Sequence, residues 1–388
     1  MNQPEWWLLF FVAIAIGYFF GRRDGRRRHV RQMEGLSREY IRGLNYFLSE
    51  QPDKAIEVFV KSLAVSEHTL ETHLALARVF RRRGELDRAT LIHSNLLDHP
   101  QLPEAARGDV QLELAQDFLS AGVLDRAEHI LQRLVEQGGR HNGTVLRMLL
   151  SIFEQEKDWH SAISTAERLL SSEAAIAPVL AQYNCELAER MIKQGQSNAA
   201  RRTLRRALQL DDQCVRASLL QGQLEMSEEN WESALRALRR VRRQDAGFFD
   251  EVLDDLEACY KALDRLDEFT QYLGRLCVEA PSTAIVLKLS ERLRLQFGDQ
   301  AASLFIADHV KTHPSVRGLK KIIDMNATAA DNNDNQQLGI LKSLADQLLQ
   351  QKVTYQCRDC GFESTRRQWQ CPSCKHWGTS RPHSHREV

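Results

Sequence analysis

Small and apolar residues recur along the middle of the chain with a period of about 34 positions. Three clear copies of a small turn, followed five residues later by an alanine, end at Ala89, Ala127 and Ala200. Weaker copies end at Ala55, Ala162, Ala234, Phe269 and Ala302. Successive intervals are 34, 38, 35, 38, 34, 35 and 33 residues. Because one such unit cannot bury its apolar face alone, this period predicts helical hairpins stacked into one array.

The other positions of the tetratricopeptide pattern follow in register with these residues. Twelve positions earlier, a small side chain lets two helices cross closely, as at Gly43, Ala77, Ala115, Ala188 and Gly222. Pro281 and Pro314 stand twelve residues after Phe269 and Ala302, where a proline can end one unit. The predicted fold class is therefore all-α, a superhelical solenoid of about eight to nine tetratricopeptide units over residues 35–351.

Two parts of this array are less regular. The small residue of the first helix is replaced at Leu150, Glu257 and Ser290. A last, capping unit over residues 316–350 has a second apolar helix that begins at Leu338, after a polar link, Asn326–Gln337. A flexible linker is the alternative for this link. We prefer a helix-turn-helix.

Residues 1–21 have the pattern of a transmembrane anchor. Trp6–Gly21 contains sixteen uncharged, mostly apolar residues, and as a helix they would extend about 24 Å, short of the roughly 30 Å hydrocarbon core. A cleaved signal peptide would need positive charge before the apolar run, and a core helix would show a polar face. Six arginines instead follow the run, in a basic juxtamembrane segment at 22–34. This predicts a cytoplasmic body and an N-terminus on the other side of the membrane.

Four cysteines near the C-terminus form two C-x-x-C pairs: Cys357, Cys360, Cys371 and Cys374. Two such turns direct four thiolates at one tetrahedral metal ion, and backbone N–H groups stabilise their charge. Zinc and a single iron both suit this ligand set, and spacing alone leaves them close. Two structural disulfides are the alternative, which a reducing cytoplasm disfavours.

The tail over residues 352–388 is too short to fold around a hydrophobic core of its own. We therefore predict a metal-binding module in which the ion replaces that core. Four aromatic residues are expected to pack around the metal: Tyr355, Phe362, Trp369 and Trp377.

The remaining cysteines and histidines predict no second site. Four cysteines lie singly on predicted helices and are interpreted as small buried residues: Cys185, Cys214, Cys259 and Cys277. Two pairs of histidines are expected on the surface: His68 with His73, and His383 with His385. The sequence has no phosphate-binding glycine loop, zinc-protease helix or serine-hydrolase turn. We predict a protein that is not an enzyme.

The formal net charge of zero hides an uneven distribution. The segment 22–31 carries +5 and the tail 353–388 carries +3, so the body 32–352 carries −7, counting Glu5. A basic field over the whole protein is absent, which argues against general nucleic-acid binding. Binding of nucleic acid by a zinc ribbon with a +3 tail is a weak alternative. The acidic body suggests a surface that prefers basic partners.

An anchor, a tetratricopeptide array and a cysteine module in this order resemble the lipopolysaccharide assembly protein B family of Gram-negative bacteria. The resemblance includes GRR from Gly21, LSREYIRGLNYFLSEQPDKAIEVF from Leu36 and FRRRGELDRATLIH from Phe80. The cysteine module is similar to a pair of rubredoxin turns through Cys360-Gly361 and Cys371-Pro372. It departs from rubredoxin at Lys375, where a glycine is usual, and in the short spacing between its cysteine pairs.

This resemblance implies a single-pass inner-membrane adaptor that regulates lipopolysaccharide synthesis. The expected partners are a membrane-anchored ATP-dependent metalloprotease, the deacetylase of the lipid A pathway whose turnover it promotes, and other synthesis or export proteins. Iron is slightly favoured over zinc as the single ion, and the module is expected to dock against the last helices. A homo-oligomer is left open. The alternatives are a rubredoxin-like electron-transfer protein and a general membrane scaffold with structural zinc.

Overall fold

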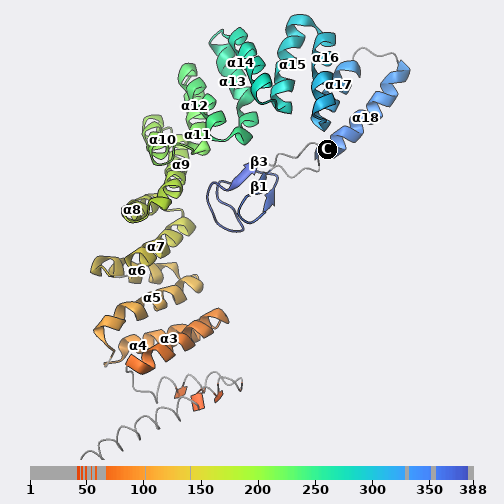
Figure 1. Cartoon of the computed structure of the whole chain (residues 1–388). Helices are drawn as coiled ribbons and strands as arrows, with labels where there is room; N and C mark the ends of the chain where they lie inside the picture. Colours follow the sequence, from red (N-terminus) through yellow and green to blue (C-terminus); the bar gives the residue numbers. More distant parts are fainter. Residues whose placement is uncertain are drawn as a thin grey trace, which may run out of the picture. The chain divides into compact units, whose positions relative to one another are not determined.

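The computed structural model describes residues 67–100, 102–139, 141–327, 332–350 and 355–382, with single positions between 42 and 58 (Figure 1). The predicted anchor at 1–21, the basic segment 22–34 and the histidines of the C-terminal tail lie outside the described residues. Every helix in the described part of the chain is too short or too polar to cross a membrane. The chain divides into two compact units, 1–156 and 157–388.

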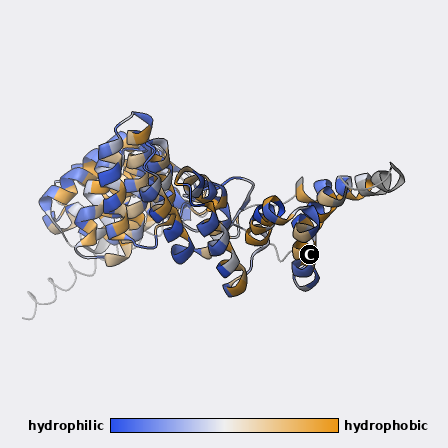
Figure 2. Cartoon of the chain, turned by 90° about the horizontal axis from the view of Figure 1, so that it is seen from above, coloured by the Kyte–Doolittle hydropathy of each residue, from blue (hydrophilic) through white to orange (hydrophobic). Residues whose placement is uncertain are grey.

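The first unit consists, in its described part, of antiparallel helices that follow one another in pairs. They are α3 (Glu67–Arg82), α4 (Leu86–Asp98), α5 (Glu104–Ser120), α6 (Leu124–Gln137) and α7 (Asn142–Glu156). Its core contains Ala77, Phe80 and Ile92, all with no exposed surface. As Figure 2 shows, the helices of the chain carry hydrophilic and hydrophobic residues side by side, which is the pattern of helices that bury one face.

The second unit continues the helical pairs and ends in a small sheet. Its helices are α8 (Trp159–Leu170), α9 (Ala177–Lys193), α10 (Ser197–Leu210), α11 (Val215–Ser227), α12 (Trp231–Gln244), α13 (Leu253–Ala262), α14 (Leu266–Glu279), α15 (Thr283–Phe297), α16 (Asp299–Thr312), α17 (Val316–Ala327) and α18 (Asn332–Gln350). Two short 3-10 helices lie between them: η1 (Ala174–Ile176) and η2 (Ala246–Val252). The described chain is thus a mostly helical tetratricopeptide solenoid, as the sequence predicts.

The packing follows the predicted register closely. The marker residues have no exposed surface wherever the structure describes them: Ala89, Ala127, Ala162, Ala200, Ala234, Phe269 and Ala302. At the small position of α11, a Cβ added to Gly222 would lie 2.5 Å from Leu238 Cδ2 of α12. The two helices therefore cross so closely that no larger side chain fits without movement.

The turn five residues before six of the described markers has a left-handed backbone whether or not it is a glycine, and before Ala302 the left-handed residue is Gly298, four residues earlier. The φ angles are 80° at Gly84, 72° at Gly122, 57° at Lys157, 73° at Gly195, 59° at Glu229 and 56° at Asp264. A side chain in this conformation costs about 1–2 kcal/mol, which glycine avoids. The packing of the repeats therefore imposes the turn even in degenerate units.

The capping unit is a helix-turn-helix, as predicted, because α17 and α18 pack against each other. Its second helix begins at Asn332 instead of Leu338, so much of the presumed polar link is helical. Asparagine and aspartate are suited to the first turn of a helix, which explains why polar composition did not mark a loop here.

The C-terminal module is a three-stranded antiparallel sheet in the order β2-β1-β3. The strands are β1 (Tyr355–Cys357), β2 (Glu363–Ser364) and β3 (Ser380–Pro382). Tyr355 pairs with Ser364 on one side and with Pro382 on the other. Cys357 ends β1 and Cys360 lies in the turn between β1 and β2, whereas Cys371 and Cys374 lie between β2 and β3.

Candidate metal centre and its contacts with the repeats

Two turns of the same shape present the four cysteines predicted as metal ligands. In the first turn, the Gly361 N–H donates to the Cys357 carbonyl at 2.9 Å, and in the second the Lys375 N–H donates to the Cys371 carbonyl at 2.9 Å. The φ angles of Gly361 and Lys375 are 75° and 62°. Lys375 thus adopts the backbone of the glycine that it replaces, so the departure from rubredoxin leaves the turn unchanged.

The four sulfur atoms are close enough to bind one ion. All four Sγ atoms lie within 4.8 Å of one another. The Sγ atoms of Cys357 and Cys374 are 3.8 Å apart, and those of Cys360 and Cys371 are 3.6 Å apart. Tetrahedral ligation with metal–sulfur bonds of about 2.3 Å requires sulfur atoms about 3.8 Å apart. The donor set therefore fits a single four-coordinate metal ion.

The charges of the thiols also favour a cation at this place. Burial opposes ionisation of Cys357, but a hydrogen bond with Thr379 Oγ1 at 3.2 Å and backbone N–H groups of its own turn lower its pKa to about 6. The backbone N–H of His376 lowers the pKa of Cys374, but burial and the neighbouring cysteine sulfurs outweigh it and raise that pKa to about 12. A metal ion would remove the repulsion that keeps the fourth thiol protonated.

Trp369 lies two residues before a cysteine of the second turn and packs onto the repeats. Its ring stacks on Phe248 of η2 with centroids 5.7 Å apart and an interplanar angle of 22°. The guanidinium carbons of Arg367 and Arg216 lie 4.9 and 5.6 Å from the centroid of the same ring. Arg216 belongs to α11 and is only 2% exposed, so the module covers a charged group of the array.

Trp377 follows the same turn and contacts a second part of the array. Its ring meets Trp159 of α8 and Tyr183 of α9 edge to face, at centroid distances of 6.0 and 5.8 Å. The next residue, Gly378, has φ of 64°, and a Cβ there would lie 3.5 Å from Gln182 Nε2. The Gly378 N–H donates to the Trp369 carbonyl at 2.7 Å. The backbone around the second cysteine pair thus holds both tryptophans in place.

Polar contacts join the edge of the sheet to η2. Glu251 accepts a hydrogen bond from Tyr355 Oη at 2.8 Å and from Arg367 Nη1 at 2.5 Å. Burial and the Glu251 carboxylate raise the pKa of Tyr355 to about 12, which keeps the phenol as a donor. Arg381 Nε lies 2.6 Å from Asp245 Oδ2 in an ion pair, although its buried N–H does not point at that oxygen.

Comparison with known proteins agrees with both parts of the chain. The rubredoxin metal binding domain family matches residues 355–382, and the tetratricopeptide repeat family matches residues 185–247. Lipopolysaccharide assembly protein B of Escherichia coli strain K12 is 32% identical over 377 residues, which is 97% of each chain. The protein of the same name from Haemophilus influenzae is 31% identical and covers 98% of each chain.

The chain belongs to the lipopolysaccharide assembly protein B family. Among solved structures, a tetratricopeptide repeat protein from Parabacteroides merdae covers 71% of this chain at 14% identity, with a TM-score of 0.32. So loose a superposition says nothing about individual residues. The position of the metal module is defined by the contacts within this chain.

The metal module of this family member docks against the middle of the array. The expected site against the last helices is wrong, because the contacts described above join the module to α8, α9, α11 and η2, as Figure 1 also shows. The expected packing of four aromatic residues around the metal is also wrong. Trp369 and Trp377 face the repeats, and Phe362 is 39% exposed. The aromatic rings of the array bury the tryptophans better than a small module can.

A cavity of about 390 Å³ opens where the module meets α9 and α11. Arg367 and Trp369 of the module form one wall. The opposite wall combines charged and aliphatic side chains: Glu189, Lys193, Arg216, Ile192, Leu219, Leu220 and Leu224. This volume is in the range of ligand-binding clefts, and the lining suits an apolar side chain that carries a polar or charged group.

Several side chains lie elsewhere than the sequence suggests. His73 is 2% exposed instead of lying on the surface, because it shares the apolar side of α3 with Leu74 and Ala77. Cys185 and Cys214 are buried as expected, but they are a pair, with Sγ atoms 3.8 Å apart. The sequence spacing of Cys185 and Cys214 did not predict this contact, because the two residues lie on different helical hairpins of the array.

The docking residues of the array had no signal in the sequence pattern. Phe248 and Glu251 lie in η2, the short helix between α12 and α13, where the tetratricopeptide pattern sets no marker residue. Arg216 was one arginine among many. A pair of adjacent aromatics outside the repeat register, at Phe248 and Phe249, is the one feature that could have marked this surface.

Proposed function

We propose that the chain is an inner-membrane adaptor that restrains lipopolysaccharide synthesis. In this proposal it presents the deacetylase of the lipid A pathway to a membrane-anchored ATP-dependent protease and so promotes turnover of that enzyme. It also brings other synthesis or export proteins together beneath the membrane. Membership over the full length of the lipopolysaccharide assembly protein B family is the observation that carries the proposal.

The architecture supports an adaptor. A tetratricopeptide array offers a long surface built from successive helices, on which a protein segment can be held. A membrane tether would keep that surface near a membrane protease and raise the effective concentration of whatever it holds. We place this tether at residues 1–21, with the remainder of the chain in the cytoplasm.

The docked metal module would give the adaptor a fixed binding geometry. Its two tryptophans join Trp159 and Tyr183 near the start of the second unit to Phe248 in the middle of it. Bridging several repeats limits the bending that a solenoid otherwise allows. The same contact forms one wall of the cavity, so we assign the cavity to a segment of the deacetylase or of the protease.

Partner identification in cells tests the adaptor. The full chain is expressed in a Gram-negative host depleted of its own family member, crosslinked in living cells and purified under denaturing conditions. We expect the protease and the deacetylase among the crosslinked proteins. The variant Cys371→Ser should lose them, and Cys277→Ser, a half-buried cysteine outside the metal centre, should retain them. Recovery of neither protein with the unmodified chain would contradict the proposal.

We propose iron as the ion at the four cysteines, in a rubredoxin-type site, with zinc as the alternative. The ligand set supports one four-coordinate ion of either kind. Elemental analysis of the purified full chain should give one iron per chain and a visible thiolate-to-iron absorbance. One zinc per chain, with no such absorbance, would assign a structural zinc instead and leave the adaptor function intact.

A further inference from the structure

The surface formed by α10 and α12 is strongly basic and lies outside the metal centre. Together, α10 and α12 contain nine arginines and one acidic residue, Glu232. Three arginines of α10 recur 34 residues later in α12: Arg202 as Arg236, Arg205 as Arg239, and Arg206 as Arg240. Because 34 residues is the period of the repeat, each pair occupies the same position of two successive second helices.

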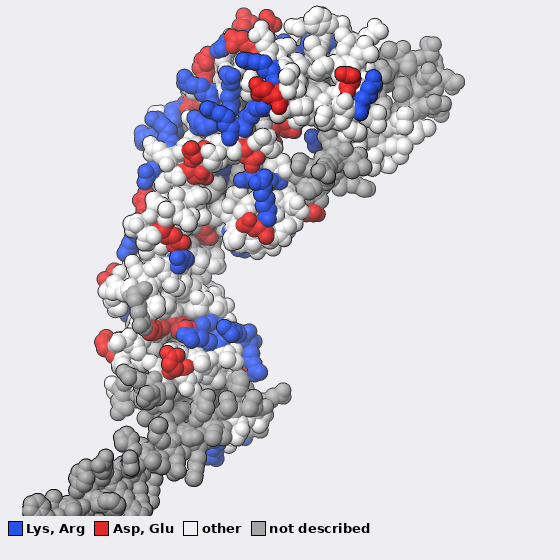
Figure 3. Space-filling view, viewed as in Figure 1, with Lys and Arg blue, Asp and Glu red and all other residues white. Residues whose placement is uncertain are grey.

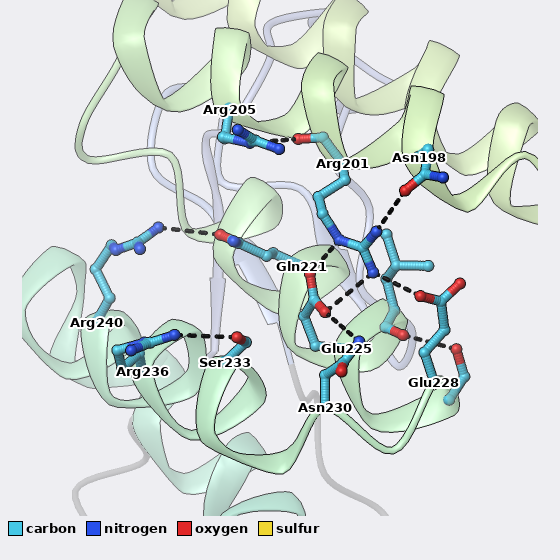
Figure 4. A network of polar contacts seen from close by, with 12 residues as sticks. Asn198, Arg201, Arg205, Gln221, Glu225, Glu228, Asn230, Ser233, Arg236 and Arg240 are labelled. Atoms are coloured by element: carbon cyan, nitrogen blue, oxygen red, sulfur yellow. Dashed lines mark hydrogen bonds and ion pairs between the residues drawn. The ribbon is translucent and has the colours of Figure 1, made fainter.

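These arginines are largely exposed, and they gather in one area. Figure 3 shows Lys and Arg side chains concentrated over the part of the array where Figure 1 places α10 and α12. Figure 4 shows Arg236 and Arg240 near each other on α12 and Arg205 on α10, and both helices pack against α11. We call six exposed side chains of this area, together with the half-buried Arg240, the arginine face: Arg202, Arg205, Arg206, Arg236, Arg239, Arg240 and Arg243.

Most of the arginine face has no carboxylate partner among the described residues. Arg205 Nε donates to the Arg201 carbonyl at 3.4 Å and Arg236 Nη2 donates to Ser233 Oγ at 3.0 Å. Arg240 Nη1 donates to Gln221 Oε1 at 3.4 Å. Burial and the charge of Arg243 lower the pKa of Arg240. Arg206 is the exception, with Nη2 3.5 Å from Glu167 Oε1. The other positive charges of the face have no ion-pair partner among the described residues.

The neighbouring Arg201 shows what a compensated arginine looks like in this array. Its guanidinium lies 2.6 Å from Glu225 Oε1 and 2.6 Å from Glu228 Oε2 (Figure 4). These ion pairs connect α10 to α11 and have a structural role. Like charges gathered without partners destabilise a fold, so the arginine face is better explained by an external anion than by stability.

The nature of the face indicates which kind of anion. None of the exposed large hydrophobic residues of the described chain lies on α10 or α12. Protein interfaces usually have apolar or aromatic anchors at their centre, and this face has none. Guanidinium groups bind phosphate in a bidentate manner, and basic clusters associate with anionic lipid head groups without any apolar contact.

We propose that the arginine face binds the phosphate head groups of an anionic membrane leaflet. The inference rests on the proposed location of the chain at the inner membrane and adds a second contact to the predicted anchor. Binding by this face would place the second unit against the membrane surface and restrict the direction in which the opposite helices meet partners. The attraction between the arginine face and the head groups is electrostatic. It should therefore weaken as salt shortens the Debye length from about 10 Å at 0.1 M to about 3 Å at 1 M.

Arginine footprinting of the full chain in vesicles tests the proposal. The chain is incorporated into phosphatidylcholine vesicles with or without phosphatidylglycerol, treated with phenylglyoxal and digested for mass spectrometry. Flotation with both kinds of vesicle is scored first, because its failure would count against the proposed anchor and not against the arginine face. We then expect the modification of Arg205 and Arg236 to fall about fivefold in anionic vesicles.

Two exposed arginines on first helices, Arg190 of α9 and Arg317 of α17, are internal controls in the same digest. Their modification should not depend on the lipid. High salt should restore the modification of the arginine face in anionic vesicles. Equal modification of Arg205 and Arg236 in the two vesicle types would overturn the proposal.

A photoreactive amino acid distinguishes a membrane from an acidic protein. It is placed in cells at Gln209, an exposed position of α10 beside the arginines, and at Gln223 of α11, which lines the cavity. The proposal expects a phospholipid adduct at Gln209 and none at Gln223. A protein adduct at Gln209 in place of lipid would overturn it and identify the arginine face as a protein interface.

Discussion

Replacing Trp369 by alanine should separate the metal module from the repeats. The substitution removes two contacts with the array: the stack on Phe248, with centroids 5.7 Å apart, and the guanidinium contact of Arg216 at 5.6 Å. An aromatic pair contributes about 0.5–1.5 kcal/mol and each cation–π contact about 0.5–1 kcal/mol. The expected loss is about 1–2.5 kcal/mol, which corresponds to a docking equilibrium about 5- to 70-fold weaker.

Metal release to an excess of chelator measures this change in the full chain. Cys360 of the first pair is exposed, whereas Cys371 of the second pair is 1% exposed and lies between the two docked tryptophans in the sequence. Complete release of the ion should therefore be proportional to the undocked fraction when docking is fast. We expect W369A to release metal about 5- to 70-fold faster. W369F, which keeps the stack on Phe248, should fall between W369A and the unmodified chain.

Two controls separate docking from damage to the module. Phe362→Ala removes an aromatic side chain of the same module that is 39% exposed, and it should leave the release rate within about twofold of the unmodified chain. Phe248→Ala should accelerate release alone but add little to W369A, because the shared stack is already lost. An unchanged release rate in W369A, or equal acceleration by F362A, would refute the coupling of metal retention to docking.

Three further outcomes follow from single contacts. Lys375→Gly should stabilise the second cysteine turn by about 0.5–1 kcal/mol, because glycine adopts the φ of 62° without strain. Slower metal release than from the unmodified chain would confirm this stabilisation, and faster release would contradict it. Gly222→Ala should lower thermal stability by about 1 kcal/mol, because its Cβ would lie 2.5 Å from Leu238 Cδ2; an unchanged melting temperature would show that the helices separate without cost. The folded pKa of Tyr355 is raised to about 12, so its hydrogen bond to Glu251 should contribute fully to stability below the ordinary pKa of about 10 and be lost as the pH rises through 12. A tyrosinate absorbance titration of the full chain, compared with Tyr355→Phe, should show one phenol that ionises near pH 12. Ionisation of this phenol near pH 10 would contradict the buried contact.

Periodicity was sufficient to predict the repeats because their packing is local. Ala200 and Ala234 are buried, and Gly222 lies where its helix crosses the helix of Leu238, sixteen residues later in the same repeat. The grouping of the four cysteines could be predicted from the sequence for the same reason. Their two turns are short, and each needs only a few residues to fix its shape.

The position of the module could not be predicted, because the contacts that decide it are far apart in sequence. Tyr355 and Arg367 reach Glu251 across 104 and 116 residues. Glu251 lies in η2, which does not follow the repeat pattern. An unusual aromatic pair, Phe248 and Phe249, is visible in the sequence, but its partner is visible only once the chain is folded.

The lifetime of the lipid A pathway deacetylase tests the account most directly. Its half-life is measured by pulse-chase in cells whose sole family member is the unmodified chain, W369A, C371S or the control F362A, each at the same abundance. The account predicts a short half-life with the unmodified chain and with F362A, and a clearly longer one with W369A and C371S. A half-life that is equally short in all four strains would contradict the claim that the docked, metal-bound module is what makes the array an adaptor.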